Sequence, residues 1–344
     1  TVTDLDGRQI TLQHEPQRII LQDGRDLMSL ALLDRDNPFQ RVVAWNNLAK
    51  KQDVATWKML QQKWPQSAAI LDMGFSDKGN VDLESVLSRQ PDLMIAQLRA
   101  KPALTESGVI GKLTALKIPV LFVDYEVNPS RDTAPSIDLL GQVLNRESNA
   151  KAYTDFYRRH LHAIEQQPAT ITPKATVFVE ALAGNSDACC FTHGHSGWGG
   201  LVEAVGATNV GSQLLPGASG FVSLEKIISM KPDAYIMTGS KRGNSQVLPL
   251  GYQVSQQEVN AQGEALLART GVSDIPAVKA KRAYGVYHHF YNHPWNIVGM
   301  EYLAKDIYPR AFTTLNPDET YHDIVRRFTS LPDLPFVFSW KQGE

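Results

Sequence analysis

The sequence predicts an α/β protein with two Rossmann-like lobes, each with a central parallel or mixed sheet, joined by one long rigid interlobe helix. Three observations predict this: short apolar runs alternate with helix-period runs, one segment is repeated, and an unbroken amphipathic stretch lies near the middle. With 344 residues, 43% of them hydrophobic, the chain can form a core in each lobe. We expect an N-terminal lobe at 1–145, the helix at 146–168 and a C-terminal lobe at 169–344.

Short runs of apolar and β-branched residues, each bounded by polar residues, Gly or Pro, predict the strands. They lie at 18–21, 41–45, 93–96, 120–123, 176–179, 234–237 and 283–287. Most are continuously hydrophobic, which is typical of strands that are covered on both faces. The runs therefore predict parallel or mixed sheets with helices on both sides.

An internal repeat predicts that the two lobes are similar. Its copies begin at Val81 and Val222, 141 positions apart, and share Val, Leu, Glu, Ser, Pro, Asp and Ile at the same offsets. Each copy is typical of an N-capped short helix, a Pro-Asp turn and a buried strand. Glu84 and Glu225 lie in the first helical turn, away from the apolar positions. On the residues alone, they could merely complement the helix dipole, which is worth about 0.3–1 kcal/mol.

The stretch 149–167 predicts the interlobe helix. It contains no Gly or Pro and is followed by Pro168. Its large apolar residues recur at three- and four-residue spacing, as expected for an amphipathic helix. They are Tyr153, Phe156, Tyr157, Leu161 and Ile164. A continuous helix restricts the motion of the lobes more than a flexible linker does.

Composition excludes some classes of protein. The 34 basic and 36 acidic residues give a formal net charge of −2, so we expect no nucleic-acid partner. No apolar run approaches the length of about 18 residues needed to span a membrane. The chain begins at Thr1 without an initiator Met or a charged-then-apolar leader. We therefore expect that Thr1 follows a removed signal peptide or another boundary. The sequence leaves open whether a lipid anchor precedes Thr1.

The two cysteines of the chain, Cys189 and Cys190, are neighbours. A bond between them cannot link distant segments of the chain. We expect two small buried hydrophobic side chains or an incidental pair, and we leave their role open.

Basic residues follow several predicted strands at their carboxyl ends, where ligands bind in open α/β sheets. Both copies of the repeat end in such residues: Arg99 with Lys101, and Lys241 with Arg242. We expect these pairs to face each other across a ligand cleft. Guanidinium groups suit an anion with oxygen acceptors, although ordinary solvated loop charges remain the alternative. Further candidates for ligand contact are Arg25 and the aromatic residues Trp45, Tyr125, Trp198 and Tyr291.

Histidines gather in two segments. His193 and His195 lie in the Gly-rich segment 190–200, which precedes a predicted helix at 200–205. We expect one of them to face the cleft, where imidazole could ligate iron or donate a hydrogen bond; a structural turn is the alternative. The helix N-terminus also favours an anion. The second segment contributes His289 as a candidate, beside His288 and His293.

A zinc metalloenzyme built from these histidines is the alternative from another class of function. It would need about three converging ligands, an open coordination position and a general base. His288 and His289 are adjacent, so they point to opposite sides of a strand, and the sequence has no His-Glu-x-x-His motif. It also lacks a nucleophile elbow, a P-loop and a dinucleotide fingerprint. We therefore expect a binding protein and not an enzyme.

Several of these features together resemble a known family. The opening segment 1–8, Pro16-Gln-Arg-Ile-Ile20, the paired repeat and the central helix are similar to the helical-backbone class (class III) of periplasmic substrate-binding proteins. These proteins serve ABC importers of ferric siderophores, haem and cobalamin. The resemblance extends in order from Thr1 to about Arg310. An insertion-like stretch at 243–278 and a tail at 317–344 depart from the pattern.

The resemblance implies a periplasmic monomer that captures an anionic ferric siderophore or related iron(III) chelate and delivers it to an ABC importer. It puts ligand contacts at the strand ends, which supports Arg99 and either Arg242 or Lys241. It implies no cofactor and no metal held directly by the protein, unless His193 or His195 ligates the iron. Haem or cobalamin, with a coordinating His, is the alternative ligand. In this family one surface Glu of each lobe docks on the membrane permease, and Glu84 and Glu225 match those positions.

Overall fold

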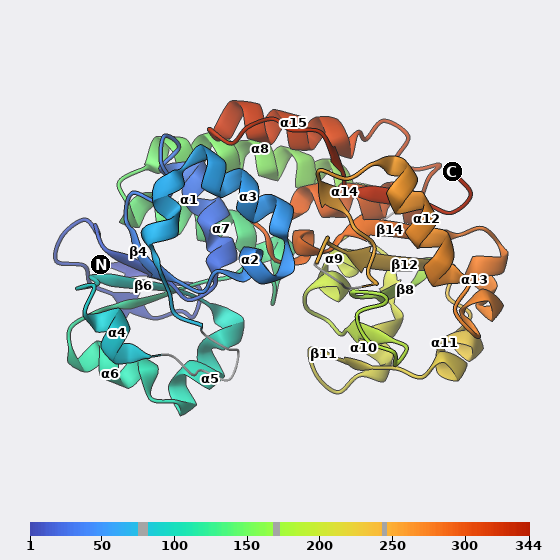
Figure 1. Cartoon of the computed structure of the whole chain (residues 1–344), viewed down its shortest axis with the longest axis horizontal. Helices are drawn as coiled ribbons and strands as arrows, with labels where there is room; N and C mark the ends of the chain where they lie inside the picture. Colours follow the sequence, from blue (N-terminus) through green and yellow to red (C-terminus); the bar gives the residue numbers. More distant parts are fainter. Residues whose placement is uncertain (75–81, 168–172, 243–245) are drawn as a thin grey trace. The chain divides into compact units, whose positions relative to one another are not determined.

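The computed structural model describes residues 1–74, 82–167, 173–242 and 246–344, and the chain divides into two compact units (Figure 1). The first unit comprises Thr1–Lys51, Trp57–Arg158 and His322–Asp333. The second comprises Gln52–Thr56, Arg159–Tyr321 and Leu334–Glu344. Among the described residues, no helix is both long and apolar enough to span a membrane.

The predicted long helix is present as α8 (Glu147–Glu165), and the chain passes from the first unit to the second within it, after Arg158. Pro168, where the helix was expected to end, lies outside the described residues. Two short segments belong to the unit opposite to the one that the predicted boundaries assign. The segment at 322–333 joins the first unit because Phe328 packs on Tyr153 and Phe156, with ring centroids 5.6 and 5.2 Å apart.

The other exception is Gln52–Thr56, which joins the second unit. Ser240 Oγ donates to the carbonyl oxygen of Gln52 at 2.8 Å, and the hydroxyl of Tyr287 donates to the carboxylate of Asp53. Neither contact has a local signal in the sequence, because each joins residues about 190 or more positions apart.

The first unit has a five-stranded parallel sheet with the order β5-β4-β3-β6-β7. Its strands are β3 (Ile19–Leu21), β4 (Val42–Trp45), β5 (Leu71–Asp72), β6 (Leu93–Gln97) and β7 (Val120–Val123). One face packs on apolar side chains of α4 (Leu83–Leu87), α5 (Lys101–Glu106) and α6 (Val109–Ala115). Helices α1 (Leu27–Leu33) and α7 (Pro129–Val143) lie on the opposite side (Figure 1).

The second unit has a mixed sheet with the order β10-β8-β12-β14-β16. Its strands are β8 (Thr176–Glu180), β10 (Thr208–Asn209), β12 (Ala234–Gly239), β14 (Ala283–Tyr287) and β16 (Ser339–Lys341). The order β10-β8-β12-β14 repeats the order β4-β3-β6-β7 of the first sheet. The α/β fold is therefore confirmed, and the repeated order agrees with the internal repeat.

The two copies of the repeat have the same local structure. Helix α4 precedes β6 and begins at Asp82, whose side chain accepts from Ser85 N. Helix α11 (Leu224–Met230) precedes β12 and begins at Ser223, whose side chain accepts from Lys226 N. Both helices are thus N-capped as the sequence predicts. Val81, the first residue of one copy, lies outside the described residues.

The Pro-Asp turns of the repeat are also equivalent. Asp92 accepts from Arg18 N beside β3, and Asp233 accepts from Thr176 N at the start of β8. Gln90 and Lys231 occupy equivalent positions before the prolines, and both have left-handed backbones, with φ 53° and 50°. Each repeated aspartate therefore fastens its turn to the beginning of the neighbouring strand.

Each sheet has one edge that is covered by an end of the chain, the N-terminal segment in the first unit and the C-terminal strand in the second. In the first unit, Asp4 accepts from Phe122 N at 3.1 Å and Arg8 donates to Val120 O at 2.7 Å, so the N-terminal segment covers the edge of β7. In the second unit, the C-terminal strand β16 pairs antiparallel with β14. Part of the tail that departs from the family pattern thus completes the second sheet.

Short paired strands and further helices make up the rest of the fold. The strand pairs are β1 (Val2–Thr3) with β2 (Gln9–Ile10), β9 (Phe191–His193) with β11 (Ser219–Phe221), and β13 (Gly251–Tyr252) with β15 (Phe336–Val337). The remaining helices are α2 (Leu48–Gln52), α3 (Val54–Lys63), α9 (Trp198–Ala204), α10 (Val210–Leu214), α12 (Gln256–Leu267), α13 (Pro276–Lys279), α14 (Asn296–Ile307) and α15 (Pro317–Phe328).

Candidate functional site

In the first unit, two predicted ligand contacts meet at one buried carboxylate. Asp23 follows β3, and its Oδ2 lies 2.7 Å from Arg25 Nη2 and 2.5 Å from Arg99 Nη2. Arg25 is held by the short turn after β3, and Arg99 by the turn after β6, so both come from the carboxyl ends of neighbouring parallel strands. The side chains of Arg25 and Arg99 are 12% and 18% exposed, so each of them keeps some solvent-accessible surface.

Carboxylates offset the positive charge of this cluster. Burial alone would raise the pKa of Asp23, but the charges of Arg25 and Arg99 hold it well below its usual value. Glu126, which follows β7, lies 3.0 Å from Nε of Arg99. Two arginines thus meet two carboxylates, and the four groups are formally neutral. The expected partner of Arg99, Lys101, is directed elsewhere and pairs with Asp6 at 2.6 Å.

A second acid in this cluster has a raised pKa. Asp26 is buried beside Asp23, and burial together with the charge of Asp23 raises its pKa well above the usual value. Gln97 Nε2 donates to Asp26 at 2.9 Å. Burial and the neighbouring charge of Asp23 thus both favour the neutral form of Asp26.

Two aromatic predictions in the first unit are wrong. Trp45 is buried between Phe39 and Trp57, with ring centroids 5.3 and 5.7 Å away. Tyr125 is fully buried, and its hydroxyl lies 2.7 Å from Ser29 Oγ. Both rings belong to the core of the unit and offer no face for a ligand to stack on.

In the second unit, two histidines directly after β14 contact hydroxyl groups at the end of the neighbouring strand β12. Nδ1 of His288 lies 2.8 Å from Thr238 Oγ1, and Nε2 of His289 lies 3.2 Å from Ser240 Oγ. Both imidazoles are buried. The ring of Tyr291 lies 4.8 Å from that of His288 and is partly exposed. Tyr291 therefore remains a candidate for ligand contact, whereas His289 has little surface to offer.

The Gly-rich segment differs from the prediction. His193 is 8% exposed, and its Nδ1 accepts from Trp198 N at 3.0 Å. The first N–H of α9 is therefore bound within the protein, which is contrary to the expected anion site at this helix N-terminus. Trp198 is fully buried and donates to His288 O, so its predicted stacking role is wrong. The side chain of His195 is 78% exposed and lies 2.8 Å from Glu203 Oε1.

The predicted cations after β12 lie near acids as well. Lys241 Nζ is 3.8 Å from Glu258 Oε1. The positive charge of Arg242 favours the charged form of Asp53. Lys241 and Arg242 line a cavity of about 340 Å³ together with Val247, Pro249, Glu258, Ala261 and Gln262. Asp53 accepts from Tyr287 and from Thr56. Burial raises its pKa to about 6, so this acid titrates near neutrality.

The sequence does not single out the acids that act on these cations, Asp23, Glu126 and Asp53. Only Asp23 has a local signal, because it lies two residues before Arg25. The sequence also does not single out Glu180 at the end of β8, which pairs with Arg269 at 2.7 Å. This pair joins residues 89 positions apart, so no local pattern could reveal it.

The histidines do not form a metal site in the described part of the chain. The group with metal-binding spacing there consists of Glu180, Cys189 and Cys190. The zinc site expected for the metalloenzyme alternative is therefore not formed by His193, His288 and His289.

The two repeated glutamates are exposed. Glu84 lies in the first turn of α4, and Glu225 in the first turn of α11. Their equivalent positions in the two copies of the repeat agree with the similar structure of the two units.

Residues 39–287, more than half of the chain, match the family described as Periplasmic binding protein. The chain belongs to this family. The match confirms the recognised resemblance to solute-binding proteins of ABC importers. Periplasmic binding proteins act outside the cytoplasm, so membership implies an extracytoplasmic location. No curated protein sequence matches the chain.

Several solved periplasmic binding proteins have a similar fold. The TroA-like periplasmic binding protein FepB from Veillonella parvula has a TM-score of 0.89 and 22% identity, with 99% of both chains covered. Haemophilus influenzae MolA, bound to molybdate, has a TM-score of 0.72 and 17% identity, covering 95% of this chain and 97% of its own. A periplasmic haem-binding protein from Pseudomonas aeruginosa has a TM-score of 0.57 and 16% identity, covering 86% and 94%. The tail at 317–344 is thus compatible with this fold.

Proposed function

We propose that this periplasmic binding protein captures an iron(III) chelate, a ferric siderophore or a related complex, and delivers it to an ABC importer. The observation that carries the proposal is the arginine pair in the first unit. Arg25 and Arg99 are fixed by one buried carboxylate, Asp23, at the carboxyl ends of two parallel strands. This edge is where open α/β sheets bind ligands.

The arginine pair suits a compact complex with many oxygen atoms. A guanidinium keeps its charge at all relevant pH values and donates several hydrogen bonds from one plane. The ion pairs with Asp23 orient both groups before a ligand arrives, which lowers the entropy lost on binding. Because Asp23 and Glu126 offset the charge, geometry contributes more to recognition than net attraction does.

In the second unit, the predicted contacts with surface to offer the chelate are Lys241, Arg242, Tyr291 and the exposed His195. The ligands named for proteins of similar fold support a metal-containing ligand, since these include molybdate for MolA and haem for the Pseudomonas protein. Haem or cobalamin is the alternative ligand. His193 accepts from Trp198 through Nδ1, so it would need Nε2 to coordinate a metal.

Delivery would use Glu84 and Glu225 as contacts for the permease. Both carboxylates are exposed and occupy equivalent positions in the repeat. Exposed charges of this kind steer association and fix the register of a complex more than they add affinity. The protein would act in the periplasm as a monomer, without a cofactor and without enzymatic activity.

A titration monitored by tryptophan fluorescence tests the proposal. The panel contains ferric catecholate, ferric hydroxamate, ferric citrate, haem, cobalamin and zinc, and the six tryptophans supply the signal. We expect saturable quenching by one ferric chelate in the micromolar range or tighter, and none by its iron-free form. Saturation by haem or cobalamin alone would replace the iron chelate with the alternative ligand. Binding of zinc alone would contradict both the iron chelate and the alternative ligands, and it would favour a zinc site built from the histidines.

A further inference from the structure

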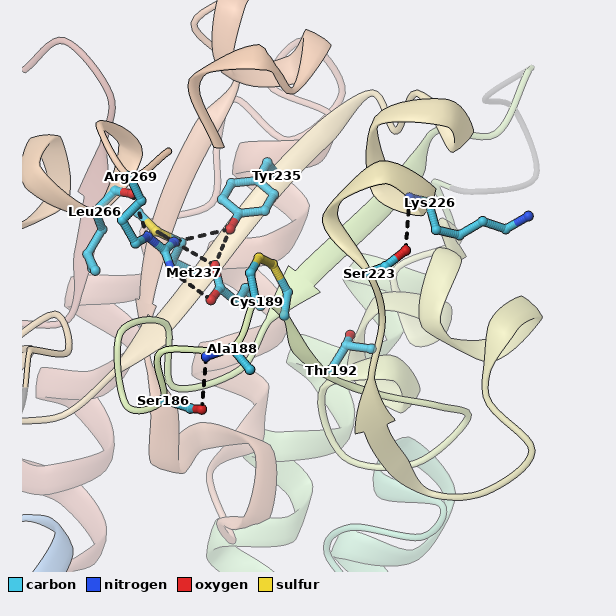
Figure 2. Close-up of a disulfide and its surroundings, with 12 residues drawn as sticks. Ser186, Ala188, Cys189, Thr192, Ser223, Lys226, Tyr235, Met237, Leu266 and Arg269 are labelled. Carbon is cyan, nitrogen blue, oxygen red and sulfur yellow. Dashed lines mark hydrogen bonds and ion pairs between the residues drawn. A yellow bond between two sulfur atoms is a disulfide. The ribbon is translucent and has the colours of Figure 1, made fainter. Parts of the chain in front are cut away.

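Cys189 and Cys190 are joined by a disulfide between neighbours in the sequence (Figure 2). Of the two small buried side chains expected here, Cys190 is buried and Cys189 is partly exposed. In the chain-entropy account, a disulfide stabilises a fold more when it closes a longer loop. This bond encloses no intervening residue, so it adds little to the stability of the fold. Any role that it has is therefore local.

The two sulfur-bearing residues differ in accessibility. Cys190 is fully buried, and its backbone exchanges two hydrogen bonds with Val222 at 2.8 and 2.9 Å. Cys189 is partly exposed and follows the exposed residues 185–188. A small thiol in solution can therefore reach the pair from the side of Cys189, while the backbone of Cys190 stays fixed.

A carboxylate lies beside the pair. One carboxylate oxygen of Glu180 and the two sulfur atoms all lie within 4.8 Å of one another. Arg269 donates to Oε1 and Oε2 of Glu180 at 2.7 and 2.9 Å, and the hydroxyl of Tyr235 donates to Oε1. Figure 2 shows these donors meeting next to the disulfide. They orient Glu180 in the way that outer hydrogen bonds orient metal ligands.

We propose that Cys189, Cys190 and Glu180 form a redox-gated metal site, which is closed while the sulfurs are bonded and binds one thiophilic divalent cation after reduction. The reductant is a dithiol. It transfers two electrons and two protons to the disulfide, gives two cysteine thiols, and becomes a disulfide itself. The cation then replaces the two thiol protons, which are released to solvent. In an oxidising compartment the closed form is the resting state.

Charge and ligand type both favour such a cation. Two thiolates and the Glu180 carboxylate carry three negative charges, and Arg269 carries one positive charge. The remaining charge of −2 matches a divalent ion. Thiolates select soft or borderline metals, so Zn²⁺ and Cd²⁺ fit these ligands better than Mg²⁺ or Ca²⁺.

A cavity leads to the site. It has a volume of about 200 Å³ and is lined by Glu180 and by Ala188 and Phe191, which flank the two cysteines. The cavity also touches the exposed residues Asn185 and Ser186. A cation can therefore reach Glu180 from solvent without opening the fold, and the two sulfur atoms lie within 4.8 Å of that carboxylate.

The test compares the oxidised and reduced forms of the full chain with Cd²⁺ as the probe. After treatment with a dithiol and its removal without oxygen, we expect two titratable thiols per folded chain. The reduced protein should bind one Cd²⁺, with a thiolate-to-metal absorption band and an affinity about tenfold or more above that of the oxidised protein. The double variant Cys189→Ser with Cys190→Ser should lose the band. Glu180→Gln should keep it and bind more weakly.

Glu203→Gln is the matched control, because Glu203 is an exposed acid of the same unit that pairs with His195. It should bind Cd²⁺ as the unchanged chain does. Equal binding by the oxidised and reduced forms, retention of the band in the double serine variant, or loss of the fold on reduction would each overturn the proposal. The comparison of redox states needs no substitution, so it holds even if a variant fails to fold. It also does not depend on the identity of the transported ligand.

Discussion

Arg99 donates to the buried carboxylate of Asp23, which also pairs with Arg25. One acid thus fixes two guanidinium groups at the carboxyl edge of the first sheet. The arrangement explains how two large cations stay oriented in a site that is only partly exposed. It also assigns Asp23 a positioning role that the arginines alone do not suggest.

Asp23→Asn should destabilise the protein at pH 7 by about 3 kcal/mol, because it leaves two partly buried cations without their shared anion. The pKa of Asp23 is lowered in the fold, so its stabilising contribution is present above the unfolded value and is lost as pH falls. The difference between variant and unchanged chain in urea unfolding should therefore shrink below about pH 4. Asp155→Asn, which removes an exposed partner of Lys151, is the control and should change stability little. Equal unfolding midpoints for Asp23→Asn and the unchanged chain at pH 7 would contradict this role.

Asp53→Asn should change how stability depends on pH. Burial raises the pKa of Asp53 from 3.8 to about 6 in the fold, so the folded state holds a proton that the unfolded state releases. Stability of the unchanged chain should decrease as pH rises from about 4 to 6, by about 3 kcal/mol from this group. The variant should lack that decrease, since an amide does not titrate. Identical stability profiles for both proteins between pH 4 and 7, measured by urea unfolding, would refute the assignment.

Glu84→Lys with Glu225→Lys should impair delivery and leave capture intact. Reversal of two exposed charges disrupts complementarity with the permease, whereas neither residue lies at a strand end. We expect ligand-stimulated ATP hydrolysis by the reconstituted importer to fall about tenfold or more, with chelate affinity unchanged. The control Glu106→Lys with Glu165→Lys changes the same total charge at exposed acids outside the repeat. A loss of the same size in the control would show a general charge effect and no docking role.

The fold could be predicted where the signal is local. Buried parallel strands are continuous apolar runs, and β7 and β14 have the predicted bounds of 120–123 and 283–287. The repeat predicted two equivalent capped helices and Pro-Asp turns, and both copies form them. By contrast, β5 and β10 have two residues each, too few for a period to be recognised.

The site was less predictable because its geometry depends on distant partners. Arg99 was found from its place after a strand, but its pairing with Asp23 crosses 76 positions. The sequence places Trp45 and Tyr125 near strand ends and Trp198 in a Gly-rich segment, but it cannot show that their rings turn into the core. Asp53 belongs to the second unit and accepts a hydrogen bond there from Tyr287, 234 positions away.

The affinity for the ferric chelate after removal of one cation from each unit tests the central claim most directly. Arg99→Gln with Arg242→Gln should weaken binding about tenfold or more in the fluorescence titration, because both predicted ligand contacts lose their guanidinium forks. Lys112→Gln with Arg310→Gln removes the same charge from exposed positions away from the strand ends and should bind as the unchanged chain does. An unchanged chelate affinity in the folded Arg99 and Arg242 double variant would contradict capture at these strand ends.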